Sequence, residues 1–259
     1  MQGGGGSEEI EFVGASGAPL RGRLRHPPGV PVGSALLAHC FTCSQDQRTV
    51  ARLARALTDA GYLTMTFDMT GLGRSGGSFA ETGFSTSVGD VVRAAVALIE
   101  RGAGPCVLVG HSLGGAAAIV AAERIHTVSA VVAVAPPPRV AHVLSLFDAD
   151  ELERLRTAGW AEVCIGGRPF VVGRRLLEEL DAADPTVSAS RLGVPLLVVA
   201  GSADTIVAPA ESRRVAEAAG ERGTFVVVDG ADHLFSGDAV DELARTVVDW
   251  LARVRSGGA

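Results

Sequence analysis

Ser112 has the sequence surroundings of a catalytic nucleophile, because it stands at the centre of Gly-His-Ser-Leu-Gly at residues 110–114. The apolar run that starts at Cys106 is typical of a strand buried on both faces, and the Ala-rich segment 113–125 predicts a helix. A strand-to-helix turn this sharp leaves no room for β-carbons at the two glycines and exposes the serine hydroxyl. The alternative is that Ser112 is a non-catalytic residue in a Gly-rich turn, but the flanking strand and helix favour a catalytic role.

A serine hydroxyl attacks a carbonyl carbon only when an oriented base removes its proton. The predicted strands 195–200 and 224–228 run into loops that contain Asp204 and His233. In this type of site, the serine, the acid and the base follow one another along the chain, each after a strand. We therefore expect Ser112 to be the nucleophile, His233 the base and Asp204 the acid that orients His233.

Three neighbouring residues are rivals for these roles. His111 adjoins the nucleophile within the turn and cannot easily face its hydroxyl, so we expect it beside the substrate instead. Asp229 and Asp232 precede His233 so closely that we expect them to cap or turn the loop.

Acyl transfer through serine also needs two N–H groups that stabilise the negative oxygen of the intermediate. The N–H of Leu113 at the predicted helix start is one candidate. The second is the N–H of Phe41, in the loop 39–44 after an early predicted strand. We expect the Phe41 ring to wall the substrate pocket and His39 to hold the loop by hydrogen bonds.

Cys40 and Cys43 admit three interpretations. With His39 they could bind zinc, but one short cluster without a second pair of ligands is weak evidence for a zinc site. They could form a redox pair, but the surrounding sequence is not thioredoxin-like. We therefore expect small thiols that pack the loop, neither catalytic nor metal-binding. Four cysteines in a chain without a predicted export signal favour reduced thiols, and we expect Cys106 and Cys164 to be buried.

Alternating strands and helices must position these side chains. Segments 8–13 and 20–26 predict an antiparallel hairpin at a sheet edge. Further strands are expected at 34–40, 63–69, 106–111, 129–135, 195–200 and 224–228, and helices at 45–60, 88–99, 113–125, 209–219 and 238–254. This order predicts an α/β fold with a mostly parallel, doubly wound sheet that has helices on both faces.

The alternation breaks between residues 137 and 192, where a small cap is expected. A helix at 141–157, a hairpin of 162–165 with 168–172 and a helix at 173–181 are predicted there. We expect Leu144 and Phe147 to reach the substrate. The domain plan is then a flexible segment or linker at 1–7, a core at 8–136 and 193–255, and the cap at 137–192.

Composition excludes several functions. The 259 residues are 47% hydrophobic and carry a net charge of -6, which argues against a nucleic-acid surface. All 23 basic residues are arginine, so no catalytic lysine exists, and no run of 18 apolar residues predicts a membrane span. The N-terminus lacks a signal-peptide pattern, so we expect a cytoplasmic protein, and the Arg-rich, Ala-rich composition is typical of bacteria. Gly71-x-Gly73 lacks the third glycine of a dinucleotide site, so we expect a tight loop held by Asp68.

Together these motifs resemble the α/β-hydrolase superfamily over about residues 8–255. More narrowly, they resemble the hydrolase half of bacterial proteins in which such a domain is fused to an OsmC-type peroxide-reducing domain. The superfamily motifs are His39-x-Phe41, Asp68-x-x-Gly-x-Gly-x-Ser75, Gly110-His-Ser-Leu-Gly-Gly115, Gly201-x-x-Asp204 and Gly230-Ala-Asp-His233. The narrower resemblance depends on His39-Cys-Phe-Thr-Cys-Ser44, Gly166-Gly-Arg-Pro-Phe170 and Gly230-Ala-Asp-His-Leu234.

The resemblance implies an α/β-hydrolase fold and serine-hydrolase chemistry, and the expected substrate is a small-molecule ester or thioester cleaved through an acyl-enzyme. No metal or cofactor is expected, and no motif indicates an oligomeric state. Acyl transfer, cyclisation or C–C bond cleavage on the same site stay open as alternatives. A thiol or redox module that uses Cys40 and Cys43 is a further, less favoured one.

Overall fold

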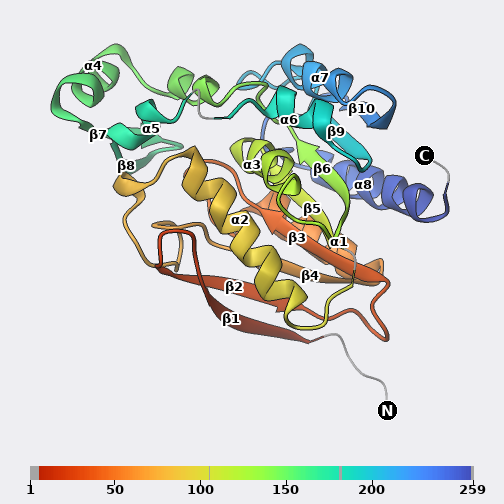
Figure 1. Cartoon of the computed structure of the whole chain (residues 1–259). Helices are drawn as coiled ribbons and strands as arrows, with labels where there is room; N and C mark the ends of the chain where they lie inside the picture. Colours follow the sequence, from red (N-terminus) through yellow and green to blue (C-terminus); the bar gives the residue numbers. More distant parts are fainter. Residues whose placement is uncertain (1–5, 105, 181–182, 258–259) are drawn as a thin grey trace.

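A single sheet of eight strands forms the centre of the computed structural model, which describes residues 6–104, 106–180 and 183–257. The strands lie in the order β1-β2-β4-β3-β5-β6-β9-β10 (Figure 1). Their bounds are β1 (Ser7–Val13), β2 (Pro19–Arg25), β3 (Gly33–Ala38), β4 (Tyr62–Phe67), β5 (Cys106–His111), β6 (Val128–Val134), β9 (Leu196–Gly201) and β10 (Gly223–Val228). Residues 1–5 of the expected flexible segment lie outside the described residues, and Ser7 already belongs to β1.

The sheet is parallel from β4 to β10, whereas β1 and β2 form an antiparallel hairpin at one edge. Helices cover both faces (Figure 1). On one face lie α2 (Phe84–Ile99), α3 (Leu113–Ala122), α6 (Pro185–Arg191) and α7 (Pro209–Ala218), and on the other lie α1 (Arg48–Asp59) and α8 (Ala239–Arg255). The predicted fold class, a mostly parallel sheet with an N-terminal hairpin, is confirmed. No helix in the described part of the chain is both long and apolar enough to cross a membrane.

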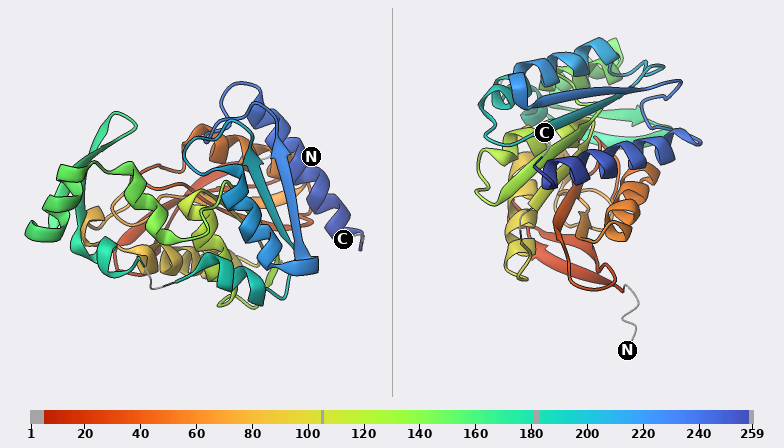
Figure 2. Two further views of the ribbon diagram at one scale, coloured as in Figure 1. Left: turned by 90° about the horizontal axis from the view of Figure 1, so that it is seen from above. Right: turned by 90° about the vertical axis from the view of Figure 1, so that its right-hand side faces the viewer.

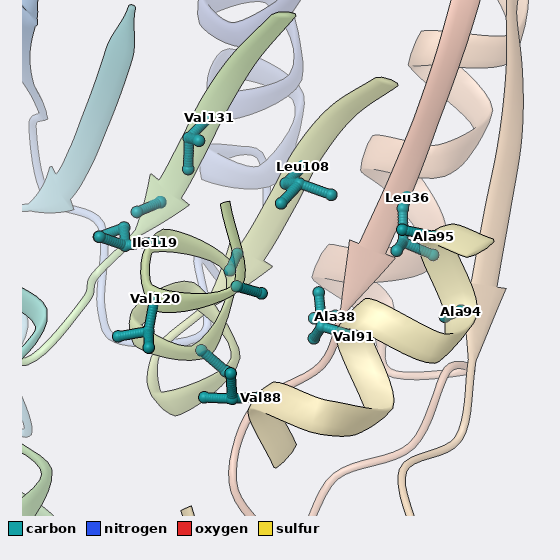
Figure 3. Close-up of a cluster of buried hydrophobic side chains, with 14 of the residues drawn as sticks. Leu36, Ala38, Val88, Val91, Ala94, Ala95, Leu108, Ile119, Val120 and Val131 are labelled. Carbon is teal, nitrogen blue, oxygen red and sulfur yellow. The ribbon is translucent and has the colours of Figure 1, made fainter. Parts of the chain in front are cut away.

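The central strands are apolar on both faces because both faces are covered. On one side, residues of α2 and α3 pack on alternate positions of β3, β5 and β6, among them Leu36, Leu108, Val131, Val88 and Ile119 (Figure 3). On the other side, the intervening residues Leu37, Val109 and Val132 pack on α1 and α8. Each fully buried Leu or Val contributes about 1.5–3 kcal/mol, so the ends of these strands are firmly placed.

The cap has its own elements and its own small apolar cluster. Its elements are the 3₁₀ helix η2 (Val140–Leu146), α4 (Ala149–Ala158), the hairpin of β7 (Trp160–Ile165) with β8 (Arg168–Gly173), and α5 (Arg174–Glu178). Figure 2 shows these elements extending beyond one side of the sheet. A further 3₁₀ helix, η1 (Phe79–Glu81), lies against β8, and η3 (Gly220–Arg222) precedes β10.

The helix expected at 141–157 is broken in two, because Asp148 starts a new helix. Its carboxylate accepts a hydrogen bond from the N–H of Glu151 (2.7 Å), and the Glu151 side chain accepts one from the N–H of Asp148 (2.8 Å). This reciprocal capping satisfies two N–H groups that would otherwise lack partners. The spacing Asp-x-x-Glu at residues 148–151 is typical of such a capped helix start.

The cap is shorter than the expected 137–192. The hairpin forms as predicted, but α5 ends at Glu178, and Asp181 of the expected helix lies outside the described residues. Helix α6, which was not expected, begins at Pro185 and packs on α3 and α7 of the core, where Ala189 and Leu192 are buried. The segment from α6 onward therefore belongs to the core.

Candidate active site

Ser112 occupies a strained turn between β5 and α3. Its backbone angles are φ 54° and ψ −122°, which few L-residues adopt. A β-carbon at Gly110 would lie 2.2 Å from the carbonyl oxygen of Gly114, and one at Gly114 would lie 2.2 Å from that of His39. The predicted need for both glycines is confirmed, and the second contact presses the turn against the loop that follows β3.

Asp204 and His233 meet at the same sheet edge, because β9 and β10 run parallel to β5. His233 Nδ1 donates to Asp204 Oδ2 at 2.8 Å, and the Asp204 side chain is fully buried. The other carboxylate oxygen accepts from the N–H groups of Ile206 (2.8 Å) and Val207 (2.9 Å). Burial alone would raise the pKa of the Asp204 carboxyl, but its hydrogen bonds and the charge of His233 outweigh it and lower this pKa.

The two rival acids hold the loops instead. Ser202 Oγ donates to Asp229 Oδ1 (2.8 Å) and accepts from the N–H of Gly230 (2.7 Å), which ties the loop after β9 to the loop after β10. Asp232 accepts from the N–H groups of Leu234 (3.1 Å) and Ser236 (2.9 Å). The prediction that both aspartates cap or turn the loop is confirmed.

The His111 side chain packs against His233. Its Nε2 is 2.8 Å from the carbonyl oxygen of His233, so Nε2 carries the proton, and the two ring centroids are 5.1 Å apart. Its Nδ1 is buried and has no hydrogen-bond partner in the described part of the chain. Burial, together with the charge of His233, lowers the pKa of His111 to about 4. We expected His111 beside the substrate, but the residue is 1% exposed and contacts His233 instead.

Phe41 and Leu113, whose N–H groups we expected to bind the negative oxygen, line one pocket. Within residues 6–104, 106–180 and 183–257, no atom accepts a hydrogen bond from the N–H of Phe41 or of Leu113. Leu113 is the first residue of α3, where an N–H has no partner inside the helix. The pair is therefore available to an oxygen that carries negative charge.

His39 anchors the loop that carries Phe41 by two hydrogen bonds. The His39 Nδ1–H donates to the carbonyl of Cys40 (2.8 Å), and its Nε2 accepts from the N–H of Met69 (3.1 Å). Complete burial lowers the pKa of His39, which keeps the ring neutral in this arrangement. The prediction that His39 holds the loop by hydrogen bonds is confirmed.

Asp68 anchors the other end of the loop. Its carboxylate accepts from the N–H of Gln45 (2.7 Å), from the Gln45 side-chain amide (3.0 Å) and from the N–H of Arg74 (3.0 Å). Gly73 has φ 55°, and a β-carbon there would lie 2.3 Å from the Asp68 carboxyl carbon. The predicted tight loop is confirmed. No sequence motif indicated Gln45, since its hydrogen bonds join two segments that meet only in the fold.

Cys40 and Cys43 form a disulfide, so the prediction of two free thiols is wrong. The turn between them, closed by the Cys43 N–H and the Cys40 carbonyl (3.2 Å), brings their α-carbons to 5.3 Å. Of the other two cysteines, Cys106 is buried as predicted, but Cys164 is exposed. In β7, Ala161 and Val163 face the cap cluster, which turns Cys164 outward.

A narrow pocket begins at Phe41 and Leu113 and extends beneath the cap. Its walls are mostly apolar and include Phe79, Val172 and Leu176. Hydroxyl-bearing residues, Thr82, Thr86 and Ser87, line the part formed by the start of α2 and the turn before it.

Leu144 and Phe147, which we expected at the substrate, are not among the residues that line this pocket. Both belong to the apolar cluster of the cap, and the Phe147 ring lies 6.4 Å from the Phe41 ring. Phe147 lies where η2 ends and α4 begins, so the continuous helix on which we expected both side chains does not form.

Residues 35–246 match the family model described as "Alpha/beta hydrolase family". The crystal structure of the esterase domain of a Rhodothermus marinus protein is 34% identical, with a TM-score of 0.77 over 96% of this chain and 98% of that one. Est1E from Butyrivibrio proteoclasticus, solved with ferulic acid bound, shares the fold at 18% identity, with a TM-score of 0.79 over 95% of this chain and 100% of that one.

Two uncharacterized proteins of Mycobacterium tuberculosis are each 29% identical over 201 residues, which is 78% of this chain. The matched segment spans 63% of the length of these curated relatives.

Proposed function

The chain belongs to the alpha/beta hydrolase family, and we propose that it is a serine hydrolase that cleaves a carboxylic ester or thioester of a small molecule. One observation carries the proposal. The buried hydrogen bond between His233 and Asp204 lies at the sheet edge where Ser112 occupies its strained turn. An esterase domain among the similar structures agrees with it. The narrower resemblance to the hydrolase half of OsmC fusion proteins stays a prediction of the motifs.

In the proposed mechanism, Ser112 Oγ attacks the carbonyl carbon of the substrate while His233 Nε2 takes its proton. Asp204 holds the other ring nitrogen, Nδ1, in its protonated form and stabilises the imidazolium that results. The N–H groups of Phe41 and Leu113 stabilise the negative oxygen of the tetrahedral intermediate.

Collapse of the intermediate expels the alcohol or thiol, which receives the proton from His233 and leaves Ser112 acylated. A water molecule then attacks the acyl carbon while His233 takes its proton. The second intermediate releases the acid and restores the Ser112 hydroxyl. Acyl transfer would replace the water by another nucleophile, so product analysis with and without an added alcohol or amine distinguishes the two reactions.

A panel of p-nitrophenyl esters and acyl thioesters of graded chain length tests the proposal. We expect hydrolysis with a clear optimum of chain length, and a loss of about 10⁴-fold or more in kcat for Ser112→Ala. Equal rates for the parent and for Ser112→Ala would contradict it.

A further inference from the structure

The disulfide between Cys40 and Cys43 encloses the residue that supplies one of the two free N–H groups. Phe41 follows Cys40 directly, and the Cys40 side chain is buried while Cys43 is half-buried. We propose that this disulfide is a positioning element for the Phe41 N–H, and that reduction by a thiol therefore lowers the rate of the hydrolase. The inference rests on the proposed function.

The conformation inside the ring needs external support. Thr42 has φ 60°, in the left-handed region that is unfavourable for a β-branched residue. Its hydroxyl donates to the carbonyl of Phe41 (2.6 Å), and its own carbonyl accepts from Arg168 Nη2 of the cap (2.9 Å). The Arg168 guanidinium lies over the Phe170 ring, 5.3 Å from its centroid, which fixes the donor.

Without the disulfide, only hydrogen bonds would hold the turn. The Cys40 carbonyl would still accept from the buried His39 Nδ1–H (2.8 Å) and from the Cys43 N–H (3.2 Å), and Arg168 would still donate to the Thr42 carbonyl (2.9 Å). None of these bonds fixes Thr42 in its left-handed conformation as a covalent link does. Reduction therefore loosens residues 41–43, and the direction of the Phe41 N–H is less well fixed even though His39 still holds the Cys40 carbonyl.

The half-buried Cys43 sulfur is the accessible point of attack. One thiolate of a dithiol such as dithiothreitol attacks Cys43 Sγ and breaks the S–S bond, and Cys40 leaves as a thiolate that takes up a proton. The second thiol of the reductant loses its proton, closes its own disulfide and releases the Cys43 thiolate, which is protonated in turn. Two electrons pass from the reductant to the protein, and two cysteine thiols result.

The effect should fall on kcat. An N–H that binds the oxyanion acts on the transition state more than on the bound substrate, and removal of one such donor costs about 10²–10³-fold in kcat. A donor that is loosened but not removed should cost about tenfold, with KM within about twofold of its original value.

The test compares the full chain before and after reduction, with the reductant removed by desalting in the absence of oxygen. Alkylation of a separate sample and its mass confirm two additional thiols. Kinetics with a p-nitrophenyl ester then give kcat and KM. We expect kcat to fall by about tenfold and to recover on reoxidation. The double variant Cys40→Ser/Cys43→Ser should show the lower kcat with or without reductant, and Cys164→Ser, which removes an exposed free thiol, should behave as the parent.

Three results would overturn the inference: an unchanged kcat after complete reduction, a reductant effect that persists in the double variant, or a fall in kcat that accompanies loss of the near-ultraviolet circular dichroism. The last would show that reduction acts on the whole fold. An oxidised parent that neither hydrolyses the esters nor reacts with a fluorophosphonate at Ser112 would instead contradict the proposed function.

Discussion

The two carboxylate oxygens of Asp204 have different hydrogen-bond partners, and this difference predicts the effect of Asp204→Asn on kcat. One oxygen accepts from two backbone N–H groups and the other accepts from His233. In Asp204→Asn, the amide oxygen is expected to keep the two N–H bonds, so the NH₂ group faces His233 Nδ1. His233 then carries its proton on Nε2 and cannot accept one from Ser112. We expect kcat to fall about 10⁴-fold.

The melting temperature is the control for this variant. Because the two backbone hydrogen bonds to the loop survive in Asp204→Asn, the melting temperature should stay within a few degrees of that of the parent. Retention of more than a tenth of kcat would show that Asp204 does not orient the base.

His111 predicts a dependence of stability on pH. Its pKa is about 4 in the folded protein, below the ordinary value near 6.5, because the ring is buried. The stabilisation is fully present above about pH 6.5 and is lost as the pH falls toward 4, since the unfolded chain then binds the proton first. By pH 5 the loss from this one group is about 2 kcal/mol.

The matching variant is His111→Gln, which keeps an N–H donor for the carbonyl of His233 but does not titrate. Urea unfolding at pH 7.5 and pH 5 should show a smaller difference for this variant than for the parent. His39 is buried and neutral as well, so part of the difference remains. Identical differences for the two proteins would exclude His111 as a source of the pH dependence.

At the scale of elements, the contact between α3 and the loop after β3 depends on a glycine. A β-carbon at Gly114 would lie 2.2 Å from the His39 carbonyl oxygen, which is backbone and cannot rotate away. Gly114→Ala must therefore displace the loop that carries Phe41. We expect kcat to fall by about 10²-fold or more, the cost of one lost oxyanion donor.

Gly193→Ala is the matched control, because no atom lies within 4 Å of a β-carbon there and its φ is not positive. It should keep the kinetics of the parent. If Gly114→Ala were as active as Gly193→Ala, the close approach of the two elements would have no role in the proposed reaction.

The sequence alone predicted the parallel sheet and the order of the site residues, because buried strands are continuous apolar runs and Ser112, Asp204 and His233 each follow one. It could not predict the disulfide, because the turn that joins the two cysteines places Thr42 in a left-handed conformation that no motif specifies. It also misplaced His111. The residue is the last of β5 and, like Val109, faces the side covered by α8, and its hydrogen-bond partner is a loop more than 120 residues away.

At the scale of the whole molecule, the cap closes the pocket from above. Leu176 of α5 lines the pocket, whereas Leu155 of α4 is buried in the cap cluster and does not line it. Truncation of either leucine to alanine removes the same atoms and should destabilise the protein by about 2–5 kcal/mol. Only Leu176→Ala should also change which acyl chains are accepted.

Rates with p-nitrophenyl acetate and octanoate measure that difference. In Leu176→Ala we expect the ratio of kcat/KM for octanoate over acetate to rise by about tenfold, as space is added to an apolar wall. Leu155→Ala should keep the ratio of the parent. A ratio that is unchanged in both variants would place the acyl group outside this pocket.

Covalent labelling of the serine tests the central claim most directly. A fluorophosphonate should add one label to the parent, and peptide mapping should locate it on Ser112, since Ser112 lies in the strained turn directly before Leu113, whose N–H has no partner inside the helix. The Ser112→Ala variant should remain unlabelled. A label that persists in Ser112→Ala, or ester hydrolysis by a parent that takes up none, would contradict the account.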